Sequence, residues 1–278
     1  MEDIPAEVAD GIAGLGLAAG GANVIMQLAR KPVGHGVARS TVESGQVHRH
    51  PVKRLRTTTA FLVITLFGTP EERRSLRAEI NCVHTAVHSE PGDEVAYDAF
   101  DPQLQLWVAA CLLQGALDID RRLCGPPDRR RLDVLYEHLK RFGTDLQVTD
   151  DLWPGDLDGF QRYWEVGVAQ IEMDDLTRSY LTTIADGSFL FAPLGRWGRP
   201  LMRLLRPWNR FMTLGFLPAP FRAELGLPWD DERQRRHDRL FGALFAAARR
   251  SPRLVRQFPL STYLWHTRRR LRAGHPVI

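Results

Sequence analysis

His84 is the side chain whose type and position are best suited to chemistry. It follows Leu76 and Ile80 at helical spacing and precedes Val87, so on a helix its imidazole lies in the apolar stripe and points into the core. A buried neutral histidine bonded to carbonyls or hydroxyls is one interpretation. An axial iron ligand is the other, because haem needs a neutral imidazole nitrogen presented from a rigid helix into an apolar slot.

Arg54 and Thr58 provide a possible complement to His84. If residues 54–62 are helical, these two side chains lie one turn apart on one face, and the apolar run of residues 61–67 continues into the core. A buried arginine is costly unless it meets an anion or several hydrogen-bond acceptors. Two interpretations stay open: Arg54 faces such a partner, or it is an exposed residue in an ordinary first helical turn.

Two other motifs are weaker indicators of chemistry. The pattern G-x-G-x-x-A at residues 14–19 binds dinucleotides only after a buried strand, whereas the preceding residues are acidic and contain Pro5. The pairs His84 with His88 and His48 with His50 have spacings that metal sites use, but a zinc site needs further ligands, and Thr85 stands where an H-E-x-x-H motif has glutamate. A dinucleotide-binding site and a mononuclear zinc site are therefore both disfavoured.

The elements that must position these residues are predicted to be helices. Apolar residues recur at helical spacing almost throughout, turn signals between them are short, and residues 104–113 are apolar nearly all round, as in a central helix. The sequence thus predicts an all-α fold in a single compact domain. We expect residues 51–278 to form its helical body and residues 1–50 a less regular arm packed on it.

Composition limits the location and the partners. The chain has 278 residues, 44% of them hydrophobic, a formal net charge of +4, three widely spaced cysteines and an acidic start, which together favour a globular protein inside the cell. Residues 11–29 are uncharged but include five glycines, so a buried helix or loop is favoured over a membrane span. Arginine clusters near the C-terminus lack a recognition element, so no nucleic-acid partner is expected.

A basic and apolar segment raises the question of membrane contact. Arginines recur at helical spacing beside tryptophans and leucines, at Arg196, Arg199, Arg203, Arg206 and Arg210. One interpretation is an interfacial helix on an anionic membrane, and the other is a kinked core-packing segment with a solvated arginine face. Pro200 and Pro207 are expected to interrupt it.

Several segments together resemble the ER-bound oxygenase and rubber-oxygenase catalytic-domain family, which includes the latex-clearing proteins. The resemblance begins at Ile25, continues to Ala273 and rests on pieces that are degenerate singly but match in order and spacing. They are Gln27 to Pro32, Gly36-Val-Ala38, Arg54 to Leu62, Phe67-Gly-Thr-Pro-Glu-Glu72, Asn81-Cys-Val-His84-Thr-Ala-Val87, Tyr97-Asp-Ala-Phe-Asp101 to Trp107, Leu217-Pro218, Phe221-Arg222 and Gly226-Leu-Pro-Trp229.

The resemblance implies an all-helical core, loosely similar to globins, around a b-type haem with His84 as the proximal ligand. The opposite side of the haem then carries Arg54, Thr57 and Thr58. Thr57 departs from the family, where rubber oxygenases have a lysine that can bind the iron, and Ala109 departs where many relatives have histidine. A glutamate base has no secure counterpart, with Glu43 the nearest candidate.

The function so implied is a haem b-dependent oxygenase that uses O2 on a hydrophobic, isoprenoid or lipid-like substrate. Arg54 and Thr58 would donate hydrogen bonds where negative charge develops on the oxygen. The alternative is a non-catalytic lipid- or haem-binding protein of the same fold, which the Thr57 and Ala109 departures favour. Peripheral contact with a membrane stays one of the two interpretations of the basic and apolar segment, and the sequence does not give the oligomeric state.

Overall fold

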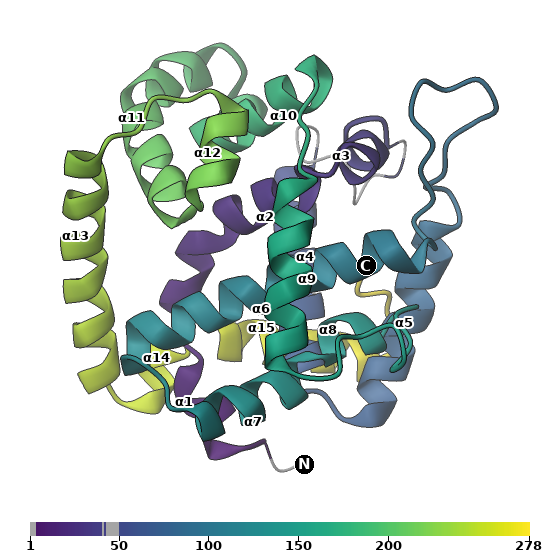
Figure 1. The fold of residues 1–278 in the computed structure, drawn as a ribbon, viewed down its shortest axis with the longest axis vertical. Helices are drawn as coiled ribbons and strands as arrows, with labels where there is room; N and C mark the ends of the chain where they lie inside the picture. The colour runs from purple at the N-terminus through teal and green to yellow at the C-terminus, as the bar shows by residue number, and fades with distance from the viewer. Residues whose placement is uncertain (1–3, 41, 43–49) are drawn as a thin grey trace.

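Helices joined by turns build the described part of the chain, with no strand among them (Figure 1). The computed structural model describes residues 4–40, 42 and 50–278. In chain order, with η marking 3-10 helices, the elements are α1 (Ala6–Gly11), η1 (Gly14–Ala19), α2 (Gly20–Leu28), α3 (Lys31–Ala38), α4 (Pro51–Phe67), α5 (Pro70–His84), α6 (Pro102–Cys124), α7 (Arg129–Leu139), α8 (Arg141–Thr144), α9 (Leu157–Ala169), α10 (Asp175–Asp186), η2 (Ser188–Trp197), α11 (Gly198–Phe216), α12 (Ala219–Leu225), α13 (Asp231–Arg250), α14 (Arg253–Arg256) and α15 (Leu260–Arg272).

The prediction of an all-α fold is confirmed, while its likeness to globins stays a prediction. Helix α6 crosses the middle of the molecule and contacts α1, α2, α7, α8, α9 and α13, as expected for a central helix (Figure 1). Its inward side chains, which include Leu106, Trp107 and Leu113, are almost fully buried. Residues 14–19, which carry the G-x-G-x-x-A pattern, form η1 and do not follow a strand.

Strong start signals define the three helices that matter most for the cavity described below. Helix α4 begins at Pro51, whose missing N–H costs nothing in the first turn. Helix α5 begins with a capping box, in which Glu72 N donates to Thr69 Oγ1 over 3.2 Å and Thr69 N donates to Glu72 Oε2 over 2.9 Å. Helix α6 is capped by Asp101, which accepts from the N–H groups of residues 103 and 104.

Residues 6–38 are more regular than the sequence predicted. Instead of an irregular arm they form α1, η1, α2 and α3, and Val8, Ile25 and Leu28 are buried in the main core. The glycines of this segment lower helix propensity, but burial of the apolar side chains against α6 and α10 outweighs that local preference. Among the helices of the described ranges, none combines the length and hydropathy of a bilayer-spanning segment.

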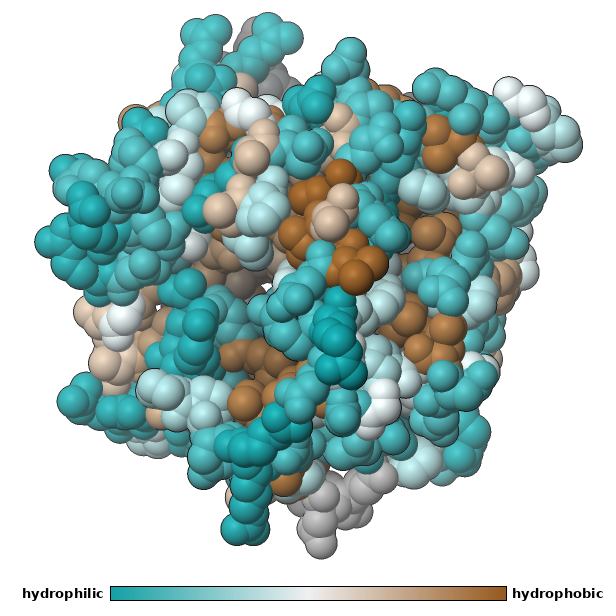
Figure 2. All heavy atoms as spheres, viewed as in Figure 1, coloured by the Kyte–Doolittle hydropathy of each residue, from teal (hydrophilic) through white to brown (hydrophobic). Residues whose placement is uncertain are grey.

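Helix α11 is also more regular than expected. Pro200 falls in its first turn, and the helix continues through Pro207, where the sequence predicted an interruption. Pro207 leaves the carbonyl of Arg203 without a helical donor, and since both residues are exposed, water can bind that carbonyl. Over the face shown in Figure 2, hydrophilic residues cover most of the surface and hydrophobic residues are exposed in separate patches.

Candidate functional site

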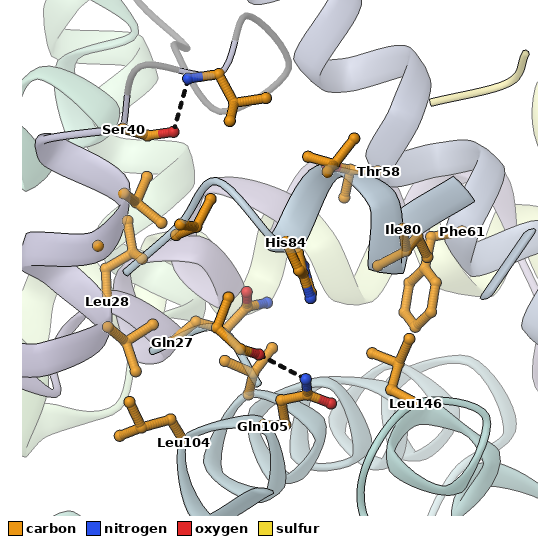
Figure 3. Close-up of a pocket in the computed structure, with 18 of the residues that line it drawn as sticks. Gln27, Leu28, Ser40, Thr58, Phe61, Ile80, His84, Leu104, Gln105 and Leu146 are labelled. Atoms are coloured by element: carbon orange, nitrogen blue, oxygen red, sulfur yellow. Dashed lines mark hydrogen bonds between the residues drawn. The ribbon is translucent and has the colours of Figure 1, made fainter. Parts of the chain in front are cut away.

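A cavity of about 270 Å³ lies among α2, α3, α4, α5 and α6 (Figure 3). Most of its wall is apolar, and the polar side chains that reach it come from segments far apart in the sequence. The apolar wall includes Leu28, Val33, Val37, Phe61, Ile80, Val83, Leu104, Val108, Leu112, Phe142, Leu146 and Ile278. The polar side chains are those of Gln27, Ser40, Arg54, Thr57, Thr58, His84, Tyr97, Asp98 and Gln105. All four residues predicted for the site, Arg54, Thr57, Thr58 and His84, therefore line one cavity.

Helix α4 brings three of these residues to the cavity on one face. Arg54, Thr57, Thr58 and Phe61 follow one another at spacings of three, one and three residues, which is the repeat of a single helical face. Thr57 is buried, and its Oγ1 donates to the carbonyl of Arg54 over 3.1 Å. Its hydroxyl hydrogen is thus used inside the helix, and Thr57 serves as part of the wall.

Arg54 places a positive charge in apolar surroundings. Burial lowers the pKa of its guanidinium, while the interaction with Tyr180 opposes that shift. Because the ordinary pKa of arginine is so high, the group still carries its charge at neutral pH. Part of its surface is reached through the cavity, and no Lys or other Arg stands among the lining residues of the described chain. Of the two interpretations of Arg54, the structure supports the inward-facing one.

His84 is the last residue of α5, and its imidazole points into the space between Gln105, Leu146 and Phe61 (Figure 3). Its Nδ1 is buried and has no hydrogen-bond partner among the described residues. Burial lowers the pKa of the ring, the charge of Arg54 lowers it further, and Asp98 opposes both. The imidazole is therefore neutral near pH 7, the form that binds a metal ion.

The end of α5 at His84 changes two expectations. Val87 lies beyond the helix, so His84 faces a cavity at a helix terminus and not the packed core in mid-helix. His88 does not share a helical face with His84 either, since it is exposed and forms an isolated antiparallel bridge with Asp98. His50 stands just before α4, while His48 and Glu43 lie outside the described residues.

A hydrogen-bonded group beside His84 was not predicted from the sequence. Gln105 donates to the carbonyl of Ala99 over 2.6 Å and to the side chain of Gln147, and it accepts from Gln147 N over 3.0 Å. Gln147 in turn donates to Asn81 Oδ1 over 2.8 Å, and Asn81 precedes His84 by three residues on α5. This group, called the glutamine network below, holds the end of α5 against α6.

Asp98 and Tyr97 are further site residues that sequence reasoning missed. Both line the cavity, and Asp98 is the carboxylate that acts on His84. The pKa of Tyr97 is raised, first by burial and then by Asp93. They stand in a turn before α6, within a segment that carries the family resemblance, but that resemblance assigned them no role. Ala109, in contrast, is buried in α6 and does not line the cavity, so the residue at this position packs in the core.

The residues of the cavity meet the chemical requirements of a haem. Iron in haem needs one protein ligand, which His84 can supply as a neutral imidazole with an unpartnered buried nitrogen, and the macrocycle needs apolar walls. No cluster of three or more metal-binding side chains occurs in the described ranges, but an iron held by a macrocycle does not require one. At about 270 Å³ the cavity is slightly smaller than common ligand sites of roughly 300–1,000 Å³, so side chains must move for a group of haem size to enter.

Comparison with known proteins identifies the family. The family described as ER-bound oxygenase mpaB/B'/Rubber oxygenase, catalytic domain, matches residues 9–250. The chain is also 40% identical over 257 residues to the uncharacterized protein Rv2237 of Mycobacterium tuberculosis and to the uncharacterized protein Mb2261 of Mycobacterium bovis, covering 92% of this chain and 98% of each relative. No solved structure matches it significantly. The chain thus belongs to the ER-bound oxygenase and rubber oxygenase catalytic-domain family.

Proposed function

We propose that this protein is a haem b-dependent oxygenase that acts with O2 on a hydrophobic substrate. One observation carries the proposal: a neutral imidazole, His84, and a charged guanidinium, Arg54, reach the same apolar cavity from two different helices. Membership of an oxygenase catalytic-domain family supports the reaction class. The haem and the substrate class are the finer parts of the proposal.

His84 is the proposed ligand of the haem iron. Haem, when bound, supplies the activation of O2 that amino-acid side chains lack. Arg54 and Thr58 lie one turn apart on α4 and are the proposed donors of hydrogen bonds to oxygen. Donors fixed in advance stabilise negative charge where it develops, and they do so most strongly in a site that excludes water. Thr57 is assigned no ligand role, because its hydroxyl hydrogen bonds within the helix.

The wall of the cavity indicates the substrate class. Branched aliphatic side chains from α3, α5 and α6, together with Phe61 of α4 and Phe142 of α8, make most of the apolar wall, which favours an isoprenoid or another lipid-like chain over a polar metabolite. Asp98 is the one carboxylate side chain among the lining residues of the described chain. It accepts from Phe100 N over 2.8 Å and acts electrostatically on His84, so we assign it to positioning the imidazole.

The test is the visible absorption spectrum of the purified protein, recorded before and after addition of haem and then of dithionite. We expect a Soret band that is lost in His84→Ala and kept in His88→Ala, since His88 is an exposed histidine that does not line the cavity. Arg54→Met should keep the band but slow oxygen consumption with a lipid substrate. Full haem content in His84→Ala would refute the ligand assignment.

The alternative proposal is a non-catalytic protein of the same fold that binds a lipid or haem. The apolar wall with a single cationic group also suits a lipid that carries an anionic head, which Arg54 would bind. The same spectrum separates the two proposals, since a colourless protein that cannot be reconstituted with haem but binds a fluorescent fatty acid would support the second. Loss of that fatty-acid binding in Arg54→Met would assign the head group.

A location inside the cell belongs to the same proposal. Cys82, Cys111 and Cys124 are all free thiols, which suits a reducing compartment. Burial raises the pKa of the Cys111 thiol well above its ordinary value, so that thiol is protonated and unreactive.

A further inference from the structure

The segment formed by η2 and the first half of α11 carries a surface that the cavity does not use. Residues 213–216 at the end of α11 are buried, and they hold the helix on the body of the protein. Most of residues 199–208 are exposed. We propose that this surface, called the α11 surface below, binds peripherally to an anionic lipid bilayer. The inference does not depend on haem or on catalysis.

Large apolar side chains form one stripe along the end of η2 and the first half of α11, and they are exposed to solvent. Trp197, Leu201, Leu204 and Trp208 follow at spacings of four, three and four residues, which places them in one stripe. Their exposed fractions are 71%, 39%, 75% and 50%. Scattered exposed leucines are ordinary, but a contiguous stripe with two tryptophans marks an interaction surface.

Arginines follow the same helical spacing on the opposite face. Arg199, Arg203 and Arg206 are exposed, and each is displaced by two residues from the apolar stripe, which is about 200° around the helix. The next arginine in the series, Arg210, instead bonds the carboxylate of Asp186 at the end of α10 and fixes α11 to the body. The side chain of Arg196 lies outside the part of the chain that the structure describes, and the other four arginines divide into three solvated charges and one structural ion pair.

Charge complementarity selects an anionic partner. Between Asp186 and Glu224 the sequence contains six arginines and no acidic residue, and while Arg210 is paired with Asp186, the charges of Arg199, Arg203 and Arg206 have no acidic neighbour in this segment. A second copy of the chain would bring the same positive charge to the contact. An anionic bilayer satisfies both faces, because leucine and tryptophan side chains enter the headgroup region while long arginine side chains stay within about 8–10 Å of the phosphates.

The test is co-sedimentation of the full chain with phosphatidylcholine vesicles, with and without phosphatidylglycerol. We expect binding only when phosphatidylglycerol is present, and weaker binding when salt is raised from about 0.1 M to about 1 M. The triple variant Arg199→Gln, Arg203→Gln, Arg206→Gln should bind roughly a hundredfold more weakly, since each basic residue near the surface contributes about a factor of five. The double variant Leu204→Ser, Trp208→Ser should lose binding at both salt concentrations.

Matched controls come from another exposed part of the chain. The double variant Leu254→Ser, Trp265→Ser removes side chains that are 80% and 61% exposed, and the triple variant Arg249→Gln, Arg250→Gln, Arg253→Gln removes three exposed charges. Both controls should bind like the wild type. Equal loss in the controls, equal binding to neutral vesicles, or no binding at all would overturn the proposal. A concentration-dependent dimer that Leu204→Ser, Trp208→Ser abolishes, without vesicle binding, would assign the surface to a second copy instead.

Discussion

Replacing Gln105 by leucine tests whether the glutamine network holds the end of α5. Gln105 is 7% exposed and makes hydrogen bonds to the carbonyl of Ala99 and to both the backbone N and the side chain of Gln147. Leucine has a similar size and suits the apolar wall, so the substitution leaves little empty space. What it removes is the polar partner of three groups at once.

The cost follows from those three groups. An unsatisfied buried donor or acceptor costs about 1–3 kcal/mol, but Gln147 is partly exposed and water can satisfy some of what it loses. The expected loss in the free energy of unfolding is therefore about 2–4 kcal/mol, less than the sum of three full penalties. Because Gln147 also bonds Asn81 one turn before His84, the variant should weaken haem binding as well.

Urea denaturation followed by circular dichroism at the helical band measures the free energy of unfolding. Gln103→Leu is the matched control, since Gln103 is exposed two residues earlier on the same helix and should change stability by less than about 0.5 kcal/mol. A loss below about 0.5 kcal/mol in Gln105→Leu would show that the network contributes nothing to stability. A loss of stability with unchanged haem affinity would show that it does not position His84.

Three further predictions concern pH, an ion pair and the cavity. Burial lowers the pKa of His84 in the folded state, so folding favours the neutral imidazole. The stability that this neutral form contributes is present above the ordinary pKa of histidine and is lost as pH falls through that value. Urea denaturation at pH 7.5 and at pH 5.5 should therefore show a smaller loss of unfolding free energy on acidification in His84→Phe than in the wild type. Arg131→Leu leaves the buried carboxylate of Asp120 without its partner and should cost about 3–5 kcal/mol in the same assay, whereas Arg129→Leu, at an exposed ion pair, should cost far less. Val108→Trp puts a large ring into existing space, so it should abolish binding of haem or lipid, measured by titration, while the unfolding midpoint falls only slightly.

The parts of the fold that the sequence predicted are those where local and tertiary signals agree. Residues 104–113 of helix α6 are apolar nearly all round, so both the existence of this helix and its central position followed from the sequence. Residues 6–38 were predicted less well, because their glycines give a weak local signal, whereas packing against α6, α7, α10 and α11 stabilises their helices. At Pro207 the prediction of an interrupted helix was wrong for the opposite reason. Proline is a strong local signal against a helix, but the helix continues through it where the residue is exposed to water.

The part of the candidate site that could be predicted from the sequence is the part that helical periodicity defines. Arg54, Thr58 and Phe61 share a face of α4 by spacing alone, and the apolar stripe of α5 directs His84 inward. The positions of Asp98 and of the hydrogen-bond partners of Gln105 are set by turns that pack against helices distant in the sequence. Helical periodicity does not predict such packing. Asn81 and Gln147 are 66 residues apart, so their hydrogen bond is a product of the tertiary fold.

The closeness of Arg54 to His84 restricts what the cavity can accept. Burial is the main reason that the pKa of the His84 imidazole is lowered, and the positive guanidinium of Arg54 lowers it further, so the ring stays neutral and able to bind a metal ion. The same charge favours a ligand that is anionic or that becomes negative during reaction, which describes both a lipid with an acidic head and oxygen that gains electrons. The two cases differ in whether they require His84. A lipid head needs Arg54 but not His84, whereas oxygenase chemistry needs both, so the double variant Arg54→Met, His84→Ala should resemble Arg54→Met alone in lipid binding and His84→Ala alone in haem binding.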